Sequence, residues 1–185
     1  NITEFITKVG VLELFKNKSI KTVVDYVIGI EVGLDTNARK NRSGTSMESL
    51  IEMFLEKMCT KTNCRFIKQA TSKKIRNELG YDVKVDKSSR TFDFAVDNFK
   101  KLYLIETNYY SGGGSKLKAT AGEYKAVYDF LKSNCKEHEF IWITDGKGWQ
   151  TAKNPLKETF YYIDYILNLE MVEKSFLEYI IVNSL

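Results

Sequence analysis

The sequence contains no apolar run that approaches the roughly 20 residues of a membrane-spanning helix. Charged residues interrupt every long hydrophobic stretch. The start of the chain, Asn1-Ile2-Thr3-Glu4, has no basic segment of the kind that opens a secretory signal. We therefore expect a soluble cytoplasmic protein with no membrane partner. Because the first residue is not methionine, we also expect that a segment of the natural protein precedes Asn1.

Cysteine and histidine are too scarce for a structural zinc site. The three cysteines, Cys59, Cys64 and Cys135, lack the paired C-x₂-C spacing of such sites, and His138 is the one histidine. We expect free thiols in a reducing compartment. Repeats, linkers and low-complexity segments are also missing, so 185 residues predict a single domain.

Hydrophobic residues make up 43% of the chain, which excludes a disordered protein. A net charge of +4 permits an anionic partner without requiring one.

Helical spacing of apolar residues predicts helices over residues 2–17 and 20–30. Residues 35–44 are polar without an apolar period, and we expect a loop there. Ser46 is then the expected cap of a third helix. The predicted buried stripe of that helix consists of Met47, Leu50, Ile51, Phe54, Leu55 and Met58.

The rest of the chain alternates between strand and helix patterns, which predicts an α/β fold with a mixed sheet flanked by helices. Strands are expected at 81–86, 91–96, 102–107 and 139–144, the second and third forming an antiparallel hairpin. Helices are expected at 71–79, stopped by Gly80, at 118–131, and from Asn154-Pro155 to the C-terminus with a break.

Asp93 and Glu106 are the first candidates for chemistry, because neighbouring strands each supply one acid close to the sheet. Side chains alternate along a strand, so Asp93 is set apart from Phe92 and Phe94, and Glu106 ends an apolar run. Two close carboxylates repel unless a cation lies between them or one is protonated. Mg²⁺ is a hard cation that takes such oxygen ligands. The alternative is that Asp93 lies at a solvated strand edge and Glu106 merely ends the next strand.

The same residues resemble a known family. Asp93, followed thirteen residues later by Glu106-Thr107-Asn108, resembles the PD-(D/E)XK nuclease signature. The run from Leu102 to Leu117, which contains Glu106-Thr107-Asn108-Tyr109-Tyr110-Ser111-Gly112-Gly113-Gly114-Ser115-Lys116, is similar to type II restriction endonucleases of the DpnII/MboI type. Residues 33–44 and 143–149 are similar to the same type.

The resemblance implies a restriction-endonuclease-like fold, with a helical portion at residues 1–34 and a nuclease core at 35–185. It implies Mg²⁺-dependent hydrolysis of double-stranded DNA at GATC by a homodimer. Asp93 and Glu106 would be the metal ligands, and the backbone carbonyl of Thr107 would be a third.

Three further residues are catalytic candidates. Asn108 takes the place of the usual lysine of the signature; it has no charge, but its amide could orient a water molecule or a phosphate oxygen. Lys116 is the nearest candidate for the missing charge, or else an ordinary solvated lysine. Glu48, at the rim of the third helix's apolar stripe, could reach the acid pair, or could simply be favoured near that helix's N-terminus.

The predicted loop before the third helix is the candidate DNA-binding segment. Arginine can bond bidentately to guanine and asparagine to adenine. The alternative is a solvated charged surface. The candidate residues are Asn37, Arg39, Lys40, Asn41 and Arg42.

The glycines Gly112 to Gly114 lack Walker spacing. They would let the backbone approach DNA, or form a flexible connector. Trp142 and Trp149 are expected in the core.

Two other functions compete with a GATC-cutting enzyme. The chain could be a DNA-binding module with a decayed nuclease site, because Asn108 replaces lysine. It could also be a nuclease of the same chemistry with another DNA specificity.

Overall fold

The computed structural model describes the backbone of residues 36–184 and side chains from Met47 onward. The chain divides into two compact units, Asn1–Ser43 and Gly44–Leu185, and the description below concerns the second. The helices predicted within residues 1–34 lie outside the described residues. Among residues 36–184, no helix is both long and apolar enough to cross a bilayer.

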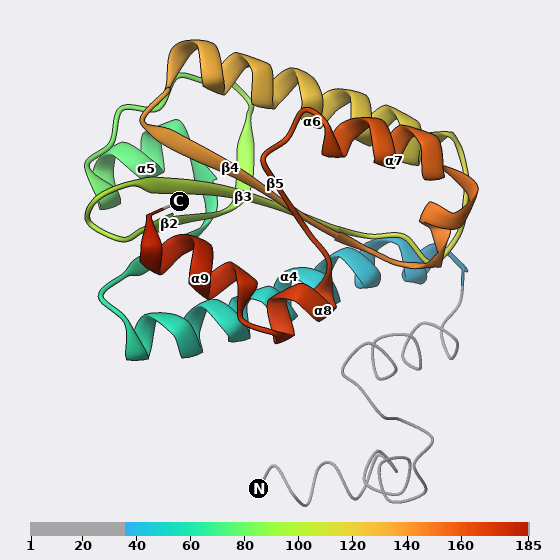
Figure 1. The fold of residues 1–185 in the computed structure, drawn as a ribbon, viewed down its shortest axis with the longest axis horizontal. Coiled ribbons are helices and arrows are strands. Elements are labelled where there is room, and N and C mark those ends of the chain that lie inside the picture. Colours follow the sequence, from blue (N-terminus) through green and yellow to red (C-terminus); the bar gives the residue numbers. More distant parts are fainter. Residues whose placement is uncertain (1–35, 185) are drawn as a thin grey trace, which may run out of the picture. The chain divides into compact units, whose positions relative to one another are not determined.

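A five-stranded mixed sheet forms the centre of the fold, in the order β1-β2-β3-β4-β5 (Figure 1). The pairs β1–β2 and β2–β3 are antiparallel, whereas the pairs β3–β4 and β4–β5 are parallel. The α/β class and the hairpin of the second and third predicted strands are therefore confirmed. The strands are β1 (Arg65–Thr71), β2 (Thr91–Asp97), β3 (Leu102–Tyr109), β4 (His138–Asp145) and β5 (Tyr165–Leu167).

Helices cover both faces of this sheet (Figure 1). In that view α6 and α7 lie above the sheet, and α8 and α9 lie below it with the part of α4 that belongs to this unit. The helices are α4 (Thr36–Lys61), α5 (Ser72–Leu79), α6 (Ser115–Asn134), α7 (Lys153–Phe160), α8 (Leu169–Glu173) and α9 (Phe176–Asn183), with a 3-10 helix, η1, at Lys147–Thr151.

Strand alternation divides the apolar side chains into two cores. On the face toward α6, Leu104, Phe140 and Trp142 of the sheet pack with Leu117, Val127 and other side chains of α6. On the other face, Tyr103 reaches α9, where its hydroxyl donates to the Ile180 carbonyl at 3.3 Å. Each fully buried aliphatic or aromatic side chain contributes about 1.5–3 kcal/mol. The predicted stripe of the third helix is buried at Met47, Ile51, Leu55 and Met58.

The predicted loop at residues 35–44 is wrong, because α4 begins at Thr36 and runs without interruption to Lys61. Alanine, arginine and lysine, at Ala38, Arg39 and Lys40, are good helix formers. A search for an apolar period detects only helices that bury a stripe, so it misses a helical turn made of polar residues.

Two strand assignments also change. Residues 81–85 have no regular secondary structure, although Val83 is buried. Alternating apolar residues mark any extended segment that buries one side, whether or not its backbone joins a sheet. The edge position belongs instead to β1, whose polar residues gave no strand pattern. In addition, β5 lies between α7 and α8, where the sequence predicted only helix with a break.

The observed ends of the helices agree better with the ends predicted from the sequence. Thr71 caps α5 by accepting a hydrogen bond from the Lys74 N–H at 3.2 Å, and Gly80 ends it in the left-handed conformation. At α7 the helix begins one residue before the predicted cap, at Lys153, so that Asn154 lies inside its first turn.

The expectation of three free thiols is wrong for two of them, because Cys59 and Cys64 form a disulfide. The turn from α4 into β1 brings their Cα atoms to 5.0 Å, within the range that a disulfide spans. An odd cysteine count does not reveal such a local pair. Cys135 is free and buried.

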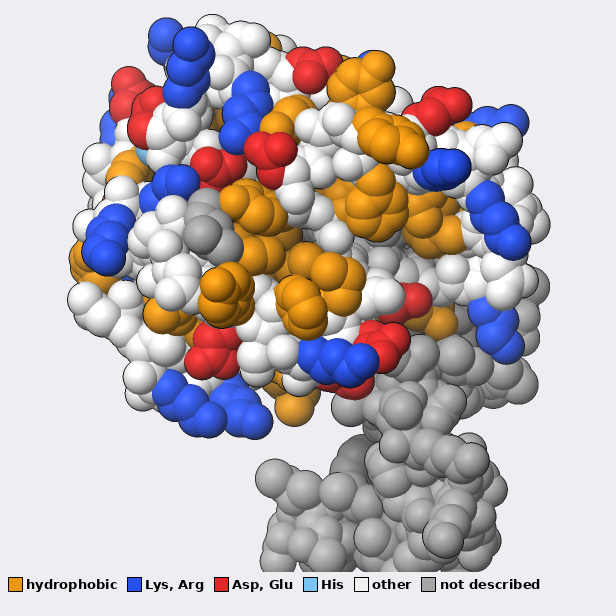
Figure 2. Space-filling model, in the orientation of Figure 1, with side chains coloured by type: hydrophobic (Ala, Val, Ile, Leu, Met, Phe, Trp, Pro, Cys, Tyr) orange, Lys and Arg blue, Asp and Glu red, His pale blue; other side chains and the backbone are white. Residues whose placement is uncertain are grey.

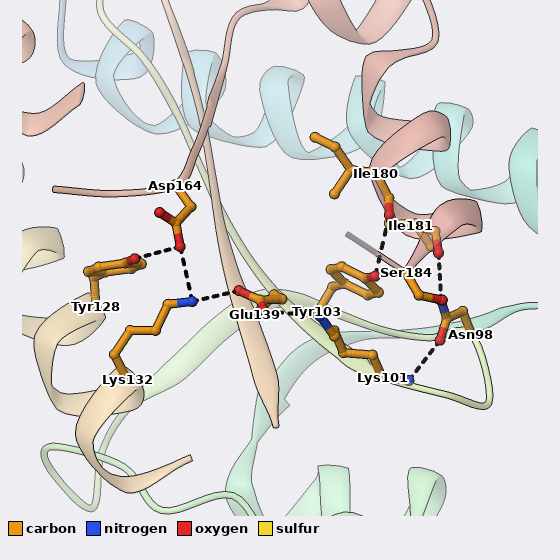
Figure 3. Close-up of polar contacts among 10 residues, drawn as sticks. All are labelled: Asn98, Lys101, Tyr103, Tyr128, Lys132, Glu139, Asp164, Ile180, Ile181 and Ser184. Carbon is orange, nitrogen blue, oxygen red and sulfur yellow. Dashed lines mark hydrogen bonds and ion pairs between the residues drawn. The ribbon is translucent and has the colours of Figure 1, made fainter. Parts of the chain in front are cut away.

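A polar network ties the C-terminal helix to the turn between β2 and β3 (Figure 3). The Asn98 amide donates to the Ile181 carbonyl and to Ser184 Oγ, and its oxygen accepts from the backbone N–H groups of Lys100 and Lys101. Asn98 is buried, so these bonds replace water that the side chain has lost.

Beside it, Lys132 bridges Glu139 and Asp164, at 3.1 and 3.0 Å (Figure 3). Lys101 also pairs with Glu139, and the Tyr128 hydroxyl donates to Asp164. These contacts lie where β4 begins, which is the opposite end of that strand from Asp145.

We predict that Asn98→Ala lowers the free energy of unfolding by about 2 kcal/mol, because buried backbone groups lose their partners. Urea unfolding measures this change. The control is Asn134→Ala, which removes an exposed side-chain bond to the Phe130 carbonyl. Its expected effect is below about 0.5 kcal/mol. Equal losses in the two variants would contradict the anchoring role of Asn98.

Candidate active site

The hairpin of β2 and β3 brings Asp93 and Glu106 toward each other. Backbone pairing runs from Asp97↔Leu102 to Phe94↔Ile105. This pairing ends one residue short of Asp93 and Glu106, where the Asp93 side chain accepts from the Thr107 N–H. The charge of Asp93 also acts on Glu106, as its pKa shows below.

Asp93 is held by Thr107. Its Oδ2 accepts hydrogen bonds from the Thr107 N–H at 2.7 Å and from Thr107 Oγ1 at 2.9 Å. Burial raises the pKa of Asp93, and the two bonds from Thr107 oppose that rise because they favour the anion. Thr107, predicted as a metal ligand through its carbonyl, thus also positions a predicted ligand through its two donors.

Glu106 is buried, with 7% of its surface exposed. Burial raises its pKa to about 8, and the charge of Asp93 contributes to this rise. The Tyr124 hydroxyl, which donates to Glu106 Oε2 at 3.1 Å, and the charge of Arg90 oppose the rise. An acid in this state becomes an anion readily only when a cation compensates it.

Asn108 is occupied by neighbours on its own face of the sheet. Its Oδ1 accepts a hydrogen bond from Trp142 Nε1 at 2.8 Å. Its amide hydrogen-bonds to the Tyr124 hydroxyl, which lowers the otherwise raised pKa of Tyr124. Its oxygen is therefore already used, which leaves less scope for the predicted orientation of a water molecule.

Lys116 is exposed in the first turn of α6, and its charge is not among the causes that shift the pKa of Asp93 or Glu106. The positive charge that acts on Glu106 is that of Arg90, whose side chain is 6% exposed. Arg90 lies immediately before β2 and pairs with Asp86 at 2.8 Å and with Glu123 at 3.1 Å. No sequence motif marks it.

Glu48 joins the site from α4. Its pKa is raised by burial and then by the charge of Asp93, which shows that the two acids are neighbours. Gln69 Nε2 donates to Glu48 Oε2 at 3.3 Å and partly offsets this shift.

Gln69 has a left-handed backbone, with φ of 49°. It lies between the pairs Lys68↔Phe94 and Ala70↔Phe92, which places it opposite Asp93. Strained backbone of this kind often occurs at functional sites. Sequence reasoning missed both this residue and Tyr124, because neither belongs to a motif.

The glycine-rich loop contacts the protein's own backbone. A side chain on Gly148 would collide with the Gly112 carbonyl, and one on Gly113 would collide with Thr151. The Gly148 N–H donates to the Tyr110 carbonyl at 2.8 Å. Within the described residues, close approach at Gly113 thus serves loop–loop packing, while space beside Gly112 and Gly114 is open. Trp142 and Trp149 are buried, as predicted.

The predicted DNA-binding residues, Asn37, Arg39, Lys40, Asn41 and Arg42, fall in the first turns of α4, and not in a loop. Their side chains lie outside the described part of the structure. They keep their proposed role as a prediction.

The donor atoms suit a hard divalent cation. Asp93 Oδ1 and Glu106 Oε1 have no hydrogen bond from the described residues, since both acids use only their second oxygen. No group of three or more His, Cys, Asp or Glu side chains in that part of the chain is arranged to hold a metal. The protein therefore offers a partial ligand set, two carboxylates and a backbone carbonyl. This set fits Mg²⁺, which usually completes its coordination with water and substrate oxygens.

A mixed sheet that presents paired acids from adjacent strands is typical of metal-dependent nucleases of the class that the sequence resembles. The model of the DpnII restriction endonuclease family matches residues 1–179. The chain belongs to this family, as the sequence predicted.

Curated relatives give the same result. The chain is 54% identical over 181 residues to the type II restriction enzyme MjaIII of Methanocaldococcus jannaschii, covering 96% of this chain and 62% of that protein. It is 46% identical over 176 residues to LlaDCHI of Lactococcus lactis subsp. cremoris, covering 94% and 58%.

It is 39% identical over 180 residues to DpnII of Streptococcus pneumoniae, covering 95% and 62%. The chain thus spans only about three fifths of the length of these relatives. No solved structure gave a significant match.

We predict that the metal-free protein loses stability as pH rises from about 5 to 8, because folded Glu106 retains a proton that the unfolded chain releases at lower pH. Glu106→Gln should remove most of this loss, on the order of 3 kcal/mol at pH 8.5. Urea unfolding with a chelator present, at pH 5.5 and pH 8.5, tests it. The exposed Glu158→Gln is the control, and a pH slope that survives Glu106→Gln would refute the assignment.

Proposed function

We propose that this chain carries the catalytic domain of a type II restriction endonuclease that hydrolyses double-stranded DNA with Mg²⁺. The observation that carries the proposal is the pair of half-buried Asp93 and buried Glu106, in a chain of the DpnII family. Burial and mutual repulsion leave this pair in need of a cation. A phosphodiesterase can use that cation at its scissile phosphate.

Asp93 and Glu106 would hold the ion through the oxygens that the protein leaves free, and the Thr107 carbonyl would be a third ligand. An ion held by these residues would supply polarisation of the scissile phosphate and activation of a water molecule as the nucleophile. Thr107 and Tyr124 keep the two acids in place. Glu48, close enough for its pKa to respond to Asp93, is a candidate to accept a proton from the water or to contact the ion through water.

Charge for the transition state has two candidate sources. Lys116 keeps this role as a prediction, since an exposed side chain on α6 is free to meet bound DNA. The charge of Arg90 does lower the pKa of Glu106, but its guanidinium already hydrogen-bonds to Asp86 and Glu123. We therefore assign Arg90 to the tuning of Glu106 and retain Lys116 for phosphate contact.

Likeness to the DpnII/MboI type predicts cleavage at GATC, in the cytoplasm, by a homodimer that places one site on each strand. Exposed apolar side chains support self-association, because large exposed apolar patches often mark interfaces. In Figure 2 hydrophobic side chains gather toward the middle of the face, with charged side chains of both signs around them. The large hydrophobic side chains that are exposed in the C-terminal region are Phe160, Tyr161, Tyr162, Phe176, Tyr179 and Val182.

Asn108 favours one competing function, a DNA-binding module whose nuclease site has decayed. Incubation of the wild-type protein with Mg²⁺ and a GATC-containing duplex separates the two. Binding without strand cleavage would support the module. Cut ends that map outside GATC would support a nuclease of other specificity.

We predict that Asp93→Ala and Glu106→Ala each abolish cleavage, because a lone carboxylate does not hold the ion. Cleavage of a labelled duplex measures the loss, and thermal unfolding shows that each variant is folded. The control Glu158→Ala, which removes an exposed acid, should retain wild-type cleavage. Full activity in either site variant would remove the proposed site.

For DNA binding, we predict that Arg39→Ala and Lys40→Ala weaken affinity and reduce the slope of log Kd against log salt by about 1 for each lost phosphate contact. Fluorescence anisotropy at several salt concentrations, with Ca²⁺ in place of Mg²⁺, measures the slope. Lys73→Ala, which removes an exposed lysine of α5, is the matched control. An unchanged slope would assign residues 37–42 to solvated surface.

A further inference from the structure

A line of polar contacts runs through the buried side of the site and ends on Glu106. Trp142 Nε1 donates to Asn108 Oδ1 at 2.8 Å. The Asn108 side chain also interacts with Tyr124, and this interaction lowers the otherwise raised pKa of the Tyr124 hydroxyl. Tyr124 in turn donates to Glu106 Oε2 at 3.1 Å. Strand β4, strand β3 and helix α6 each contribute to this line.

The chemistry of the donors fixes the direction of every bond. An indole N–H can only donate, so the oxygen of Asn108 must face Trp142. The NH₂ group of Asn108 therefore faces Tyr124, whose oxygen accepts from it. The single hydroxyl hydrogen of Tyr124 is then left for Glu106. A line of this polarity must end on an acceptor, and the ionised carboxylate is the strongest acceptor that a protein offers.

Packing gives these groups little freedom to turn. Trp142 has no exposed surface, and Tyr124 has 6%. Their rings meet edge to face with centroids 5.2 Å apart, and Trp142 meets Trp149 in the same manner at 5.6 Å. Close-packed aromatic rings cannot rotate without disturbing their neighbours. Each polar atom of the line is consequently held where it stands.

We propose that Trp142, Asn108 and Tyr124 are positioning residues that act through Glu106, binding its Oε2 so that Oε1 faces the metal and substrate. This inference rests on the proposed function. It also gives Asn108 a reason to replace lysine. Lysine has no acceptor atom, so a lysine at position 108 would leave the Trp142 N–H without its partner. On this inference, Asn108 is part of a functional active site that uses a different residue at the lysine position, and it does not indicate a decayed site.

Tyr124→Phe tests the inference, since it removes the last donor and keeps the ring. Removal of a residue that orients a metal ligand typically costs about 10–100-fold in metal affinity or activity, and we expect losses in that range for both Mn²⁺ affinity and kcat. Calorimetric titration of the DNA-free protein with Mn²⁺ measures the first, and Mg²⁺-dependent cleavage of a duplex measures the second. KM for DNA should stay nearly constant, because Tyr124 is buried away from the duplex.

The control is Tyr128→Phe, one helical turn further along α6. It removes an equivalent hydroxyl, which donates to Asp164 at 2.7 Å. Its Mn²⁺ affinity and kcat should stay within about twofold of wild type, because distant sites act independently. Equal losses in both variants would reduce the role of Tyr124 to general stability and overturn the inference.

Asn108 supplies a second test that does not depend on Tyr124→Phe folding well. Asn108→Ala should lower Mn²⁺ affinity, and the double variant with Tyr124→Phe should lose little more than either single one, because both act on the same bond. Asn108→Lys, which recreates the usual signature, should also fall below wild type. A kcat above that of the wild type in the Asn108→Lys protein would overturn the inference.

Failure of the proposed function has a different result. A wild-type protein that neither binds Mn²⁺ nor cuts DNA would refute the function, and with it the role of Glu106. A wild type that does both, while Tyr124→Phe matches it in Mn²⁺ affinity and kcat, would refute the positioning line alone.

Discussion

Repulsion between two desolvated acids is the constraint on which the site depends. The pairing of β2 with β3, two interior strands of the sheet, brings half-buried Asp93 near buried Glu106, where water screens their charges less than it would on the surface. Three neighbours limit that cost without removing it: Thr107 binds one acid, Tyr124 binds the other, and Arg90 contributes a positive charge, whereas Glu48 adds a further acid. The remaining imbalance is what a divalent cation would correct.

Much of the fold follows from local patterns. The three central strands bury side chains on both faces and gave apolar runs, and α5 carries both its cap and its terminating glycine within a short stretch of sequence. Errors arose where a pattern has two physical causes. Residues 81–85 alternate because they bury Val83, not because they pair. Residues 36–43 lack an apolar period in sequence, yet their backbone is helical, and Ala38, Arg39 and Lys40 among them are good helix formers.

The site was predictable only in part. Asp93 and Glu106 could be paired from strand alternation, because a hairpin fixes the relation of residues so close in sequence, and family likeness then supplied their role. Gln69 and Tyr124 were missed because their contacts join distant segments: 21 residues separate Gln69 from Glu48, and 18 separate Tyr124 from Glu106. No local pattern encodes such a meeting. The tertiary fold does.

The glycines between β3 and α6 carry a consequence for divergence. Gly148 touches the Gly112 carbonyl, Gly146 touches Tyr110, and the Tyr110 N–H bonds to the Asp145 carbonyl at 2.9 Å. The backbone that follows β3 is therefore in direct contact with the backbone that follows β4. A side chain at Gly146 or Gly148 would collide with the main chain of the β3–α6 connection, so a substitution there should require a matching change in that connection.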